Sequence, residues 1–189
     1  MEPLVLASGS PRRREILTLL GIPFEVCPAS SEEAVDPRLP LDEAVAAVAA
    51  GKAREIAAAH PGRTVLAADT VVVLGDQLLG KPRDEADARR MLRSLQGCDH
   101  EVLTGVWLFG PALPVQGRGF TDRAKVSFYP MDDGEIDDYI ATGEPMDKAG
   151  SYGIQGRGLR FVRGVCGDFY TVMGLPAARL WRFLRELGL

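Results

Sequence analysis

The sequence predicts an α/β protein in which a mixed central sheet is flanked by helices. Apolar residues recur at helical spacing in some segments, such as 41–59, and short apolar or β-branched runs, such as 65–74, lie between those segments. The composition, with 46% hydrophobic and 25% charged residues, is that of an ordinary globular protein. No repeat or linker divides the 189 residues, so we expect a single domain over 1–189.

The order of elements follows from periodicity and from capping and turn residues. Ser10 and Pro11 suit the N-cap and first position of a helix, Asp84 suits another N-cap, and Gly75-Asp76 predicts a hairpin turn. The unbroken run 65–74 is typical of a strand covered on both faces. We expect strands at 4–7, 24–27, 65–74, 102–109, 124–129, 161–165 and 168–173. We expect helices at 11–20 and 41–59, between Asp84 and Gly97, from Asp132 or Asp133 to Ile140, and from Pro176 onward.

Charge and cysteine content exclude several classes of protein. The net charge of −4 provides no broad basic field, so we expect no nucleic-acid partner. Three cysteines without CxxC spacing indicate neither a disulfide framework nor a zinc site, which fits the cytoplasm. No apolar run approaches the ~20 residues of a membrane span, so no membrane association is expected.

A strand-to-helix turn near the N-terminus has the chemistry of an anion site. Ser8-Gly9-Ser10-Pro11 leads into Arg12 and Arg13, at a place where unpaired backbone N–H groups and the helix dipole favour negative charge. The alternative is an ordinary capped helix with its arginines in solvent.

Two charged residues interrupt segments that are otherwise apolar. Lys52 lies within the apolar stripe of helix 41–59, and Asp69 lies within the strand 65–74. A buried charge needs a partner, a metal or a ligand. Lys52 could instead extend its ammonium group to water, and Asp69 could be a satisfied structural carboxylate. For Asp69 we favour a function, either holding Mg²⁺ or activating water for attack on phosphorus.

Three further segments carry candidate ligand-binding residues. Glu32 and Glu33 could complete a magnesium site, although such a pair is usually a solvated surface feature. Lys81 lies between Gly80 and Pro82, where a fixed backbone could direct its amine inward. In the glycine-rich run 147–158, Gln155 carries an amide that can both donate to and accept from a base edge, unless the run is shaped only for packing. His60 and His100 are interpreted as structural.

Taken in order, these segments resemble the Maf family of nucleotide pyrophosphatases. Six runs carry the resemblance and together span nearly the whole chain. They are Leu6 to Arg13, Ala68-Asp69-Thr70, Gly80-Lys81-Pro82, Gly97 to Val106 with His100 and Thr104-Gly105-Val106, Glu144 to Gly158, and Gly167-Asp168 with Gly174-Leu175-Pro176.

The resemblance implies a fold similar to that of inosine triphosphate pyrophosphatases, with two lobes around a cleft. It implies hydrolysis of a nucleoside triphosphate to the monophosphate and pyrophosphate, by in-line attack of water activated by a divalent cation, Mg²⁺ or Mn²⁺. Asp69 would be the proton acceptor and a metal ligand, and Glu33 would help hold the metal. The residues expected to grip the triphosphate are Ser8, Arg13, Lys52 and Lys81.

The same resemblance indicates which bases are preferred. Arg12, Thr70 and Gln155 occupy positions associated with the branch of the family that acts on dTTP and UTP, and modified pyrimidine nucleotides are further candidates. The alternatives are a 7-methyl-GTP pyrophosphatase and a regulator of septum formation that binds nucleotides without cutting them. The sequence leaves the oligomeric state open, including a homodimer.

Overall fold

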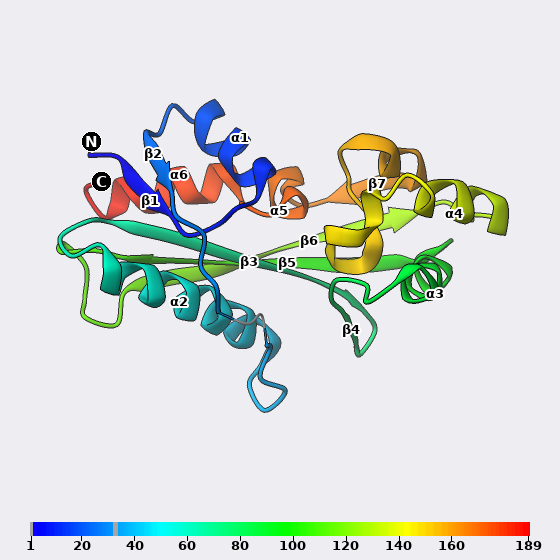
Figure 1. The fold of residues 1–189 in the computed structure, drawn as a ribbon, viewed down its shortest axis with the longest axis horizontal. Coiled ribbons are helices and arrows are strands. Elements are labelled where there is room, and N and C mark those ends of the chain that lie inside the picture. The colour runs from blue at the N-terminus through cyan, green and yellow to red at the C-terminus, as the bar shows by residue number, and fades with distance from the viewer. Residues whose placement is uncertain (1, 32–33) are drawn as a thin grey trace. The chain divides into compact units, whose positions relative to one another are not determined.

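The computed structural model describes residues 2–31 and 34–189, and within them it shows one mixed sheet of seven strands (Figure 1). The strands are β1 (Leu4–Leu6), β2 (Phe24–Val26), β3 (Val65–Leu74), β4 (Gln77–Leu79), β5 (Asp99–Phe109), β6 (Arg118–Phe128) and β7 (Val162–Cys166). Their order is β2-β1-β3-β5-β6-β7, with β4 paired to β3. Strand β1 runs parallel to β2 and β3, whereas the β3–β4 and β6–β7 pairs are antiparallel. The predicted mixed α/β fold class is therefore confirmed.

Helices connect most of these strands. The α-helices are α1 (Pro11–Leu19), α2 (Leu41–Ala59), α3 (Glu85–Leu95), α4 (Asp133–Ile140), α5 (Phe169–Met173) and α6 (Ala177–Glu186). Three short 3₁₀ helices, η1 (Glu144–Asp147), η2 (Ala149–Ser151) and η3 (Gly156–Phe161), lie between α4 and β7. The side chain of Asp84 caps α3, as predicted, by accepting the Asp87 N–H at 2.7 Å.

The residues group into two compact units. The first unit comprises Met1–Asp69, Thr104–Asp122 and Gly174–Leu189, and the second comprises Thr70–Leu103 and Arg123–Met173. Strands β3, β5 and β6 each contribute residues to both units.

In the first unit, helices cover both faces of the strands. Helix α2 lies on one side, and α1 and α6 lie on the other (Figure 1). Residues Val65 to Ala68 of β3 are all buried, which explains why this stretch is an unbroken apolar run. Ala53 and Ile56 of α2 pack against Val65 in the core.

In the second unit, ion pairs join α3 to α4, and aromatic side chains form the core. Arg89 pairs with Asp137, and Arg93 pairs with Asp133 at 2.8 Å. The aromatic rings of this unit contact one another edge to face or tilted. The members of this aromatic cluster are His100, Phe128, Tyr139, Tyr152 and Phe161.

His100 makes the stability of the second unit sensitive to acid. Its Nε2 lies 2.8 Å from the Tyr152 hydroxyl, while its buried Nδ1 has no hydrogen-bond partner among the described residues. Burial, only partly opposed by the charge of Asp99, lowers the pKa of His100 from 6.5 to about 4. The unfolded chain therefore binds a proton more readily than the folded chain between these pH values. The contribution of His100 is fully present above pH 6.5 and is lost as the pH falls toward 4.

We expect this proton linkage to lower the free energy of unfolding by about 3 kcal/mol between pH 6.5 and pH 4. Urea unfolding across this range should show a steeper loss of stability in the wild type than in His100→Gln. The variant His60→Gln, at the other histidine, should follow the wild type. Equal slopes in the wild type and His100→Gln would contradict the assignment.

Several predicted boundaries were wrong, each for a local reason. The segment 168–173 is not a strand but contains helix α5, because Asp168 accepts the Tyr170 N–H through its side chain and the Thr171 N–H through its carbonyl. Ser10 occupies the N-cap of α1, as predicted, although its side chain makes no capping hydrogen bond. Strand β6 begins at Arg118 and not at residue 124 as expected, and Pro176 precedes α6 as its N-cap.

Candidate active site

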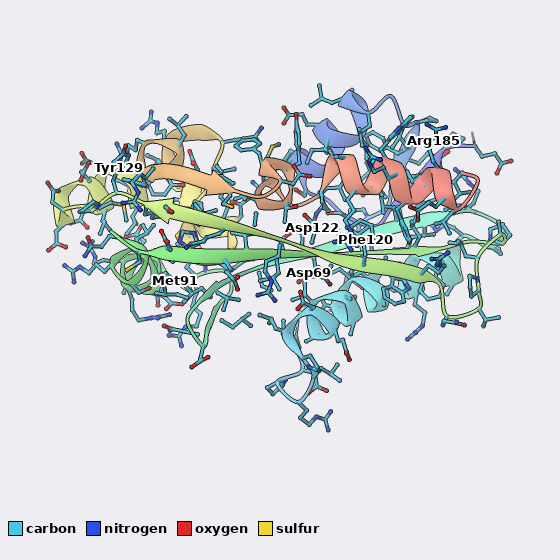
Figure 2. The ribbon with its side chains drawn as sticks, turned by 180° about the vertical axis from the view of Figure 1, so that it is seen from behind. Asp69, Met91, Phe120, Asp122, Tyr129 and Arg185 are labelled. Atoms are coloured by element: carbon cyan, nitrogen blue, oxygen red, sulfur yellow. The ribbon has the colours of Figure 1, made fainter. Side chains whose placement is uncertain are left out.

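Lys52 and Asp69, the two charged residues in apolar segments, form a buried ion pair. Lys52 Nζ of α2 lies 2.7 Å from Asp69 Oδ1 of β3, and the two side chains are 8% and 6% exposed. Figure 2 shows Asp69 on the side of the strands where α2 lies. Charges this deeply buried are costly even when paired. A carboxylate has two oxygens, so a lysine bonded to one of them still permits a further contact.

The turn between β1 and α1 orients Arg13. Arg13 Nη1 donates to Ser8 Oγ at 2.9 Å, and Arg13 Nε donates to the Gly174 carbonyl at 2.9 Å. Ser8 Oγ also accepts the Ser10 N–H at 3.2 Å. The guanidinium group is thus held in a fixed plane at the N-terminus of a nine-residue helix, where phosphate oxygens are favoured.

Strand pairing brings these two groups to the same end of a parallel pair. Leu6 of β1 pairs with Leu66 of β3, and both strands run in the same direction. Ser8 is two residues beyond Leu6, and Asp69 is three residues beyond Leu66. A basic anion-binding turn and a buried carboxylate therefore lie at one end of the sheet pair within the first unit. This combination suits chemistry on a phosphate ester or anhydride.

The predicted residues Thr70, Lys81 and Gln155 belong to the second unit. Lys81 is exposed, whereas Thr70 and Gln155 are half-buried. The turn before Lys81 is bonded to the glycine-rich run, because the Gly150 N–H donates to the Gly80 carbonyl at 3.0 Å.

Comparison with known proteins identifies the family. The profile of the family described as Maf-like protein matches residues 3–187 of the chain.

The chain belongs to the Maf family.

Three relatives of this Maf chain share one functional name. A protein from Halalkalibacterium halodurans named dTTP/UTP pyrophosphatase is 47% identical, over 100% of this chain and 97% of its own length. Proteins with the same name from Bacillus cytotoxicus, 47% identical over 98% of this chain and 96% of its own, and from a Geobacillus species, 44% identical over 100% of both, also match.

The fold of the Maf chain also occurs in solved structures of low identity. A HAM1 protein from Coxiella burnetii superposes with a TM-score of 0.55 at 15% identity, over 98% of this chain and 100% of its own. The Ham1 protein of Staphylococcus aureus gives a TM-score of 0.51 at 14% identity, over 100% of both chains. These likenesses support the predicted α/β architecture.

One carboxylate of the Maf chain fits a site for a divalent cation. Among residues 2–31 and 34–189, no group of three His, Cys, Asp or Glu side chains could hold a metal. Two metal ligands were predicted, Asp69 and Glu33. The structure describes Asp69, whereas Glu33 lies outside the described residues. One or two carboxylates suffice for Mg²⁺ when substrate phosphates supply further oxygens, so Asp69 fits such a site.

Sequence reasoning missed one group that orients a predicted site residue of the Maf chain and one that holds the segment after β2. One is the Gly174 carbonyl that orients Arg13. The other is Glu55, which accepts the Ser30 N–H at 2.8 Å and its hydroxyl at 2.7 Å, and the Ser31 N–H at 3.0 Å. These bonds, led by the backbone N–H of Ser30, lower the pKa of Glu55 to about 2. Glu55 follows Lys52 by three residues on α2, a spacing that marks neighbouring positions on a helix.

No helix within the described part of the Maf chain is long and apolar enough to cross a membrane.

Proposed function

We propose that this chain hydrolyses dTTP and UTP to the nucleoside monophosphate and pyrophosphate, and that residues 1–189 act as one domain. The observation that carries the proposal is the buried Asp69–Lys52 pair, at the end of the β1–β3 strand pair where the turn with Ser8 and Arg13 also lies. The names of relatives that are 44–47% identical over nearly the whole chain support the choice of substrate.

In the proposed reaction, water adds to the α-phosphorus as the bond between that phosphorus and the oxygen bridging the α and β phosphates breaks. Asp69 accepts the proton that the water loses, and pyrophosphate leaves with the bridging oxygen. Arg13 and Lys52 stabilise the negative charge that develops on the phosphate oxygens, and Ser8 fixes the plane of Arg13. Lys52 can move part of its interaction from Asp69 to phosphate, because an ammonium group has three N–H donors.

We propose that Asp69 would help to hold a divalent cation, Mg²⁺ or Mn²⁺, which would neutralise phosphate charge when bound. Glu33 is the second proposed ligand. Lys81 is proposed to contact the triphosphate, and Arg12, Thr70 and Gln155 are proposed to select the base, on the strength of the family resemblance.

A nucleotide panel tests the proposal. Purified protein would be incubated with dTTP, UTP, dCTP, dGTP and 7-methyl-GTP, with Mg²⁺, with Mn²⁺ or with EDTA, and released pyrophosphate would be measured. We expect release from dTTP and UTP at least about tenfold faster than from the other nucleotides, as hydrogen-bonded base recognition allows. Binding without pyrophosphate release would refute hydrolysis. Preferred cleavage of 7-methyl-GTP would refute the choice of substrate.

A further inference from the structure

Glu144 is a half-buried carboxylate at the start of η1 that receives three hydrogen bonds within the second unit. Its Oε1 accepts the Tyr139 hydroxyl at 2.8 Å and the Gly158 N–H at 3.2 Å, and its Oε2 accepts the Arg157 N–H at 2.9 Å. Burial alone would raise the pKa of Glu144, but these donors outweigh it and lower the pKa. Glu144 is therefore an ionised acceptor at neutral pH.

Tyr139 extends this arrangement to a second point on the backbone. Its side chain is fully buried, and its hydroxyl both donates to Glu144 and accepts the Gly153 N–H at 3.0 Å. Burial raises the pKa of Tyr139, so the hydroxyl keeps its proton and can donate. Glu144 and Tyr139 thus form one connected clamp, which we call the Glu144–Tyr139 clamp.

The Glu144–Tyr139 clamp holds the backbone on both sides of Gln155. Gly153 lies two residues before Gln155, and Arg157 lies two residues after it. Gln155 is the N-cap residue of η3, a position whose side chain often accepts a hydrogen bond from the first turn, but the Gln155 side chain makes no such bond. Glu144 accepts the first-turn N–H groups in its place. The amide of Gln155 is therefore not used for capping.

Two glycines allow the chain to close around the clamp. A Cβ atom at Gly156, where φ is +78°, would lie 2.8 Å from Glu144 Oε2. A Cβ atom at Gly158 would collide with the Gly153 carbonyl oxygen and would lie 2.8 Å from the Tyr139 hydroxyl oxygen. Side chains at these positions would displace Glu144, Tyr139 or the backbone at Gly153, so the clamp requires glycine at both positions.

We propose that Glu144 and Tyr139 are positioning residues for substrate selection, which fix the turn that presents the Gln155 amide to the base. This inference rests on the proposed function. Neither residue needs to touch the nucleotide, because the effect passes through the backbone at residues 153–158. A hydrogen-bonding amide discriminates between bases only when its direction is fixed, since a mobile amide can adapt to several base edges.

The test compares Glu144→Gln, Tyr139→Phe and Gln155→Ala with the wild type. For each protein, kcat and KM would be measured with dTTP and with dGTP. We expect Glu144→Gln to lower the ratio of kcat/KM for dTTP over dGTP about tenfold, mostly through KM for dTTP, as the loss of a charge-assisted hydrogen bond allows. Tyr139→Phe should change the ratio in the same direction. In the Gln155→Ala background, Glu144→Gln should change it less than about twofold, because the two residues act as a unit.

Amide hydrogen exchange provides a readout that does not depend on activity. The amides of Gly153, Arg157 and Gly158 should exchange at least about tenfold faster in Glu144→Gln, because glutamine replaces one accepting oxygen with an NH₂ group and removes the charge that strengthens the remaining hydrogen bonds.

Glu135→Gln is the matched control, because the Glu135 side chain also accepts a backbone N–H, that of Asp132, in the capping box of α4. It should lower thermal stability without changing the dTTP/dGTP ratio or the exchange of residues 153–158. An unchanged ratio in Glu144→Gln, an unchanged ratio in Gln155→Ala, or additive effects in the double variant would each overturn the inference while dTTP hydrolysis by the wild type stands. A wild type that releases no pyrophosphate from dTTP would overturn the proposed function, and this inference with it.

Discussion

Replacing Asp69 with asparagine is expected to lower kcat for dTTP by about a hundredfold or more, the usual loss when a key charged group is removed from the reaction centre. Asparagine keeps the shape of the side chain but cannot accept the proton from water. The substitution also leaves the Lys52 ammonium without the carboxylate that lies 2.7 Å away. We therefore expect the free energy of unfolding to fall by roughly 3 kcal/mol as well, as when one partner of a buried ion pair is removed.

A second buried carboxylate separates these two effects. Asp87 on α3 is also buried, and it pairs with Arg90 at 2.7 Å and with Arg83 at 3.4 Å. Asp87→Asn should also destabilise the protein, by less than Asp69→Asn because the side chains of Arg83 and Arg90 are 84% and 50% exposed, yet leave kcat within about threefold of the wild type at a temperature where both variants are folded. If both asparagine variants lose turnover to the same extent, Asp69 acts through stability and not through chemistry.

The candidate site could be predicted in part because a buried charged residue interrupts an otherwise apolar segment of the sequence. Lys52 interrupts an apolar helical stripe, and Asp69 interrupts a β-branched run, so each is anomalous within its own segment. Their pairing could not be predicted, because it depends on how α2 packs on β3, and periodicity defines a helix face but not the residue it meets.

The groups that position the site could be predicted least. Gly174 supplies a backbone carbonyl to Arg13, 161 residues away in the chain, and a carbonyl is present at every residue. Glu144 resembles any half-exposed glutamate until η3 places two N–H groups against it. The pattern for helix α5 was misleading because residues 169–172, Phe-Tyr-Thr-Val, favour strands, whereas the side chain of Asp168 directs the local turn.

The second large loss of activity is expected from substitution of Arg13, because two separate segments of the chain fix the orientation of its guanidinium group. Lysine at position 13 keeps the charge but loses the planar fork that donates to Ser8 Oγ and to the Gly174 carbonyl. We expect Arg13→Lys to lower kcat/KM for dTTP about a hundredfold, the loss typical of removing one preorganised donor from developing phosphate charge. Both kcat and KM should change, since the group is proposed to bind the triphosphate before and during the reaction.

Arg14 offers a matched control one position along the same helix. Its side chain is exposed, and its backbone carbonyl accepts a hydrogen bond from the Thr18 hydroxyl at 2.9 Å. Arg14→Lys makes the same chemical change at the same helix end, so it should leave kcat/KM within about twofold of the wild type, as surface substitutions usually do. No loss in either variant would mean that the general positive charge of the helix end, which lysine retains, binds the triphosphate. Equal losses in the two variants would contradict a special role for Arg13. A loss confined to Arg13→Lys would assign that role to the guanidinium group that Ser8 and Gly174 hold in place.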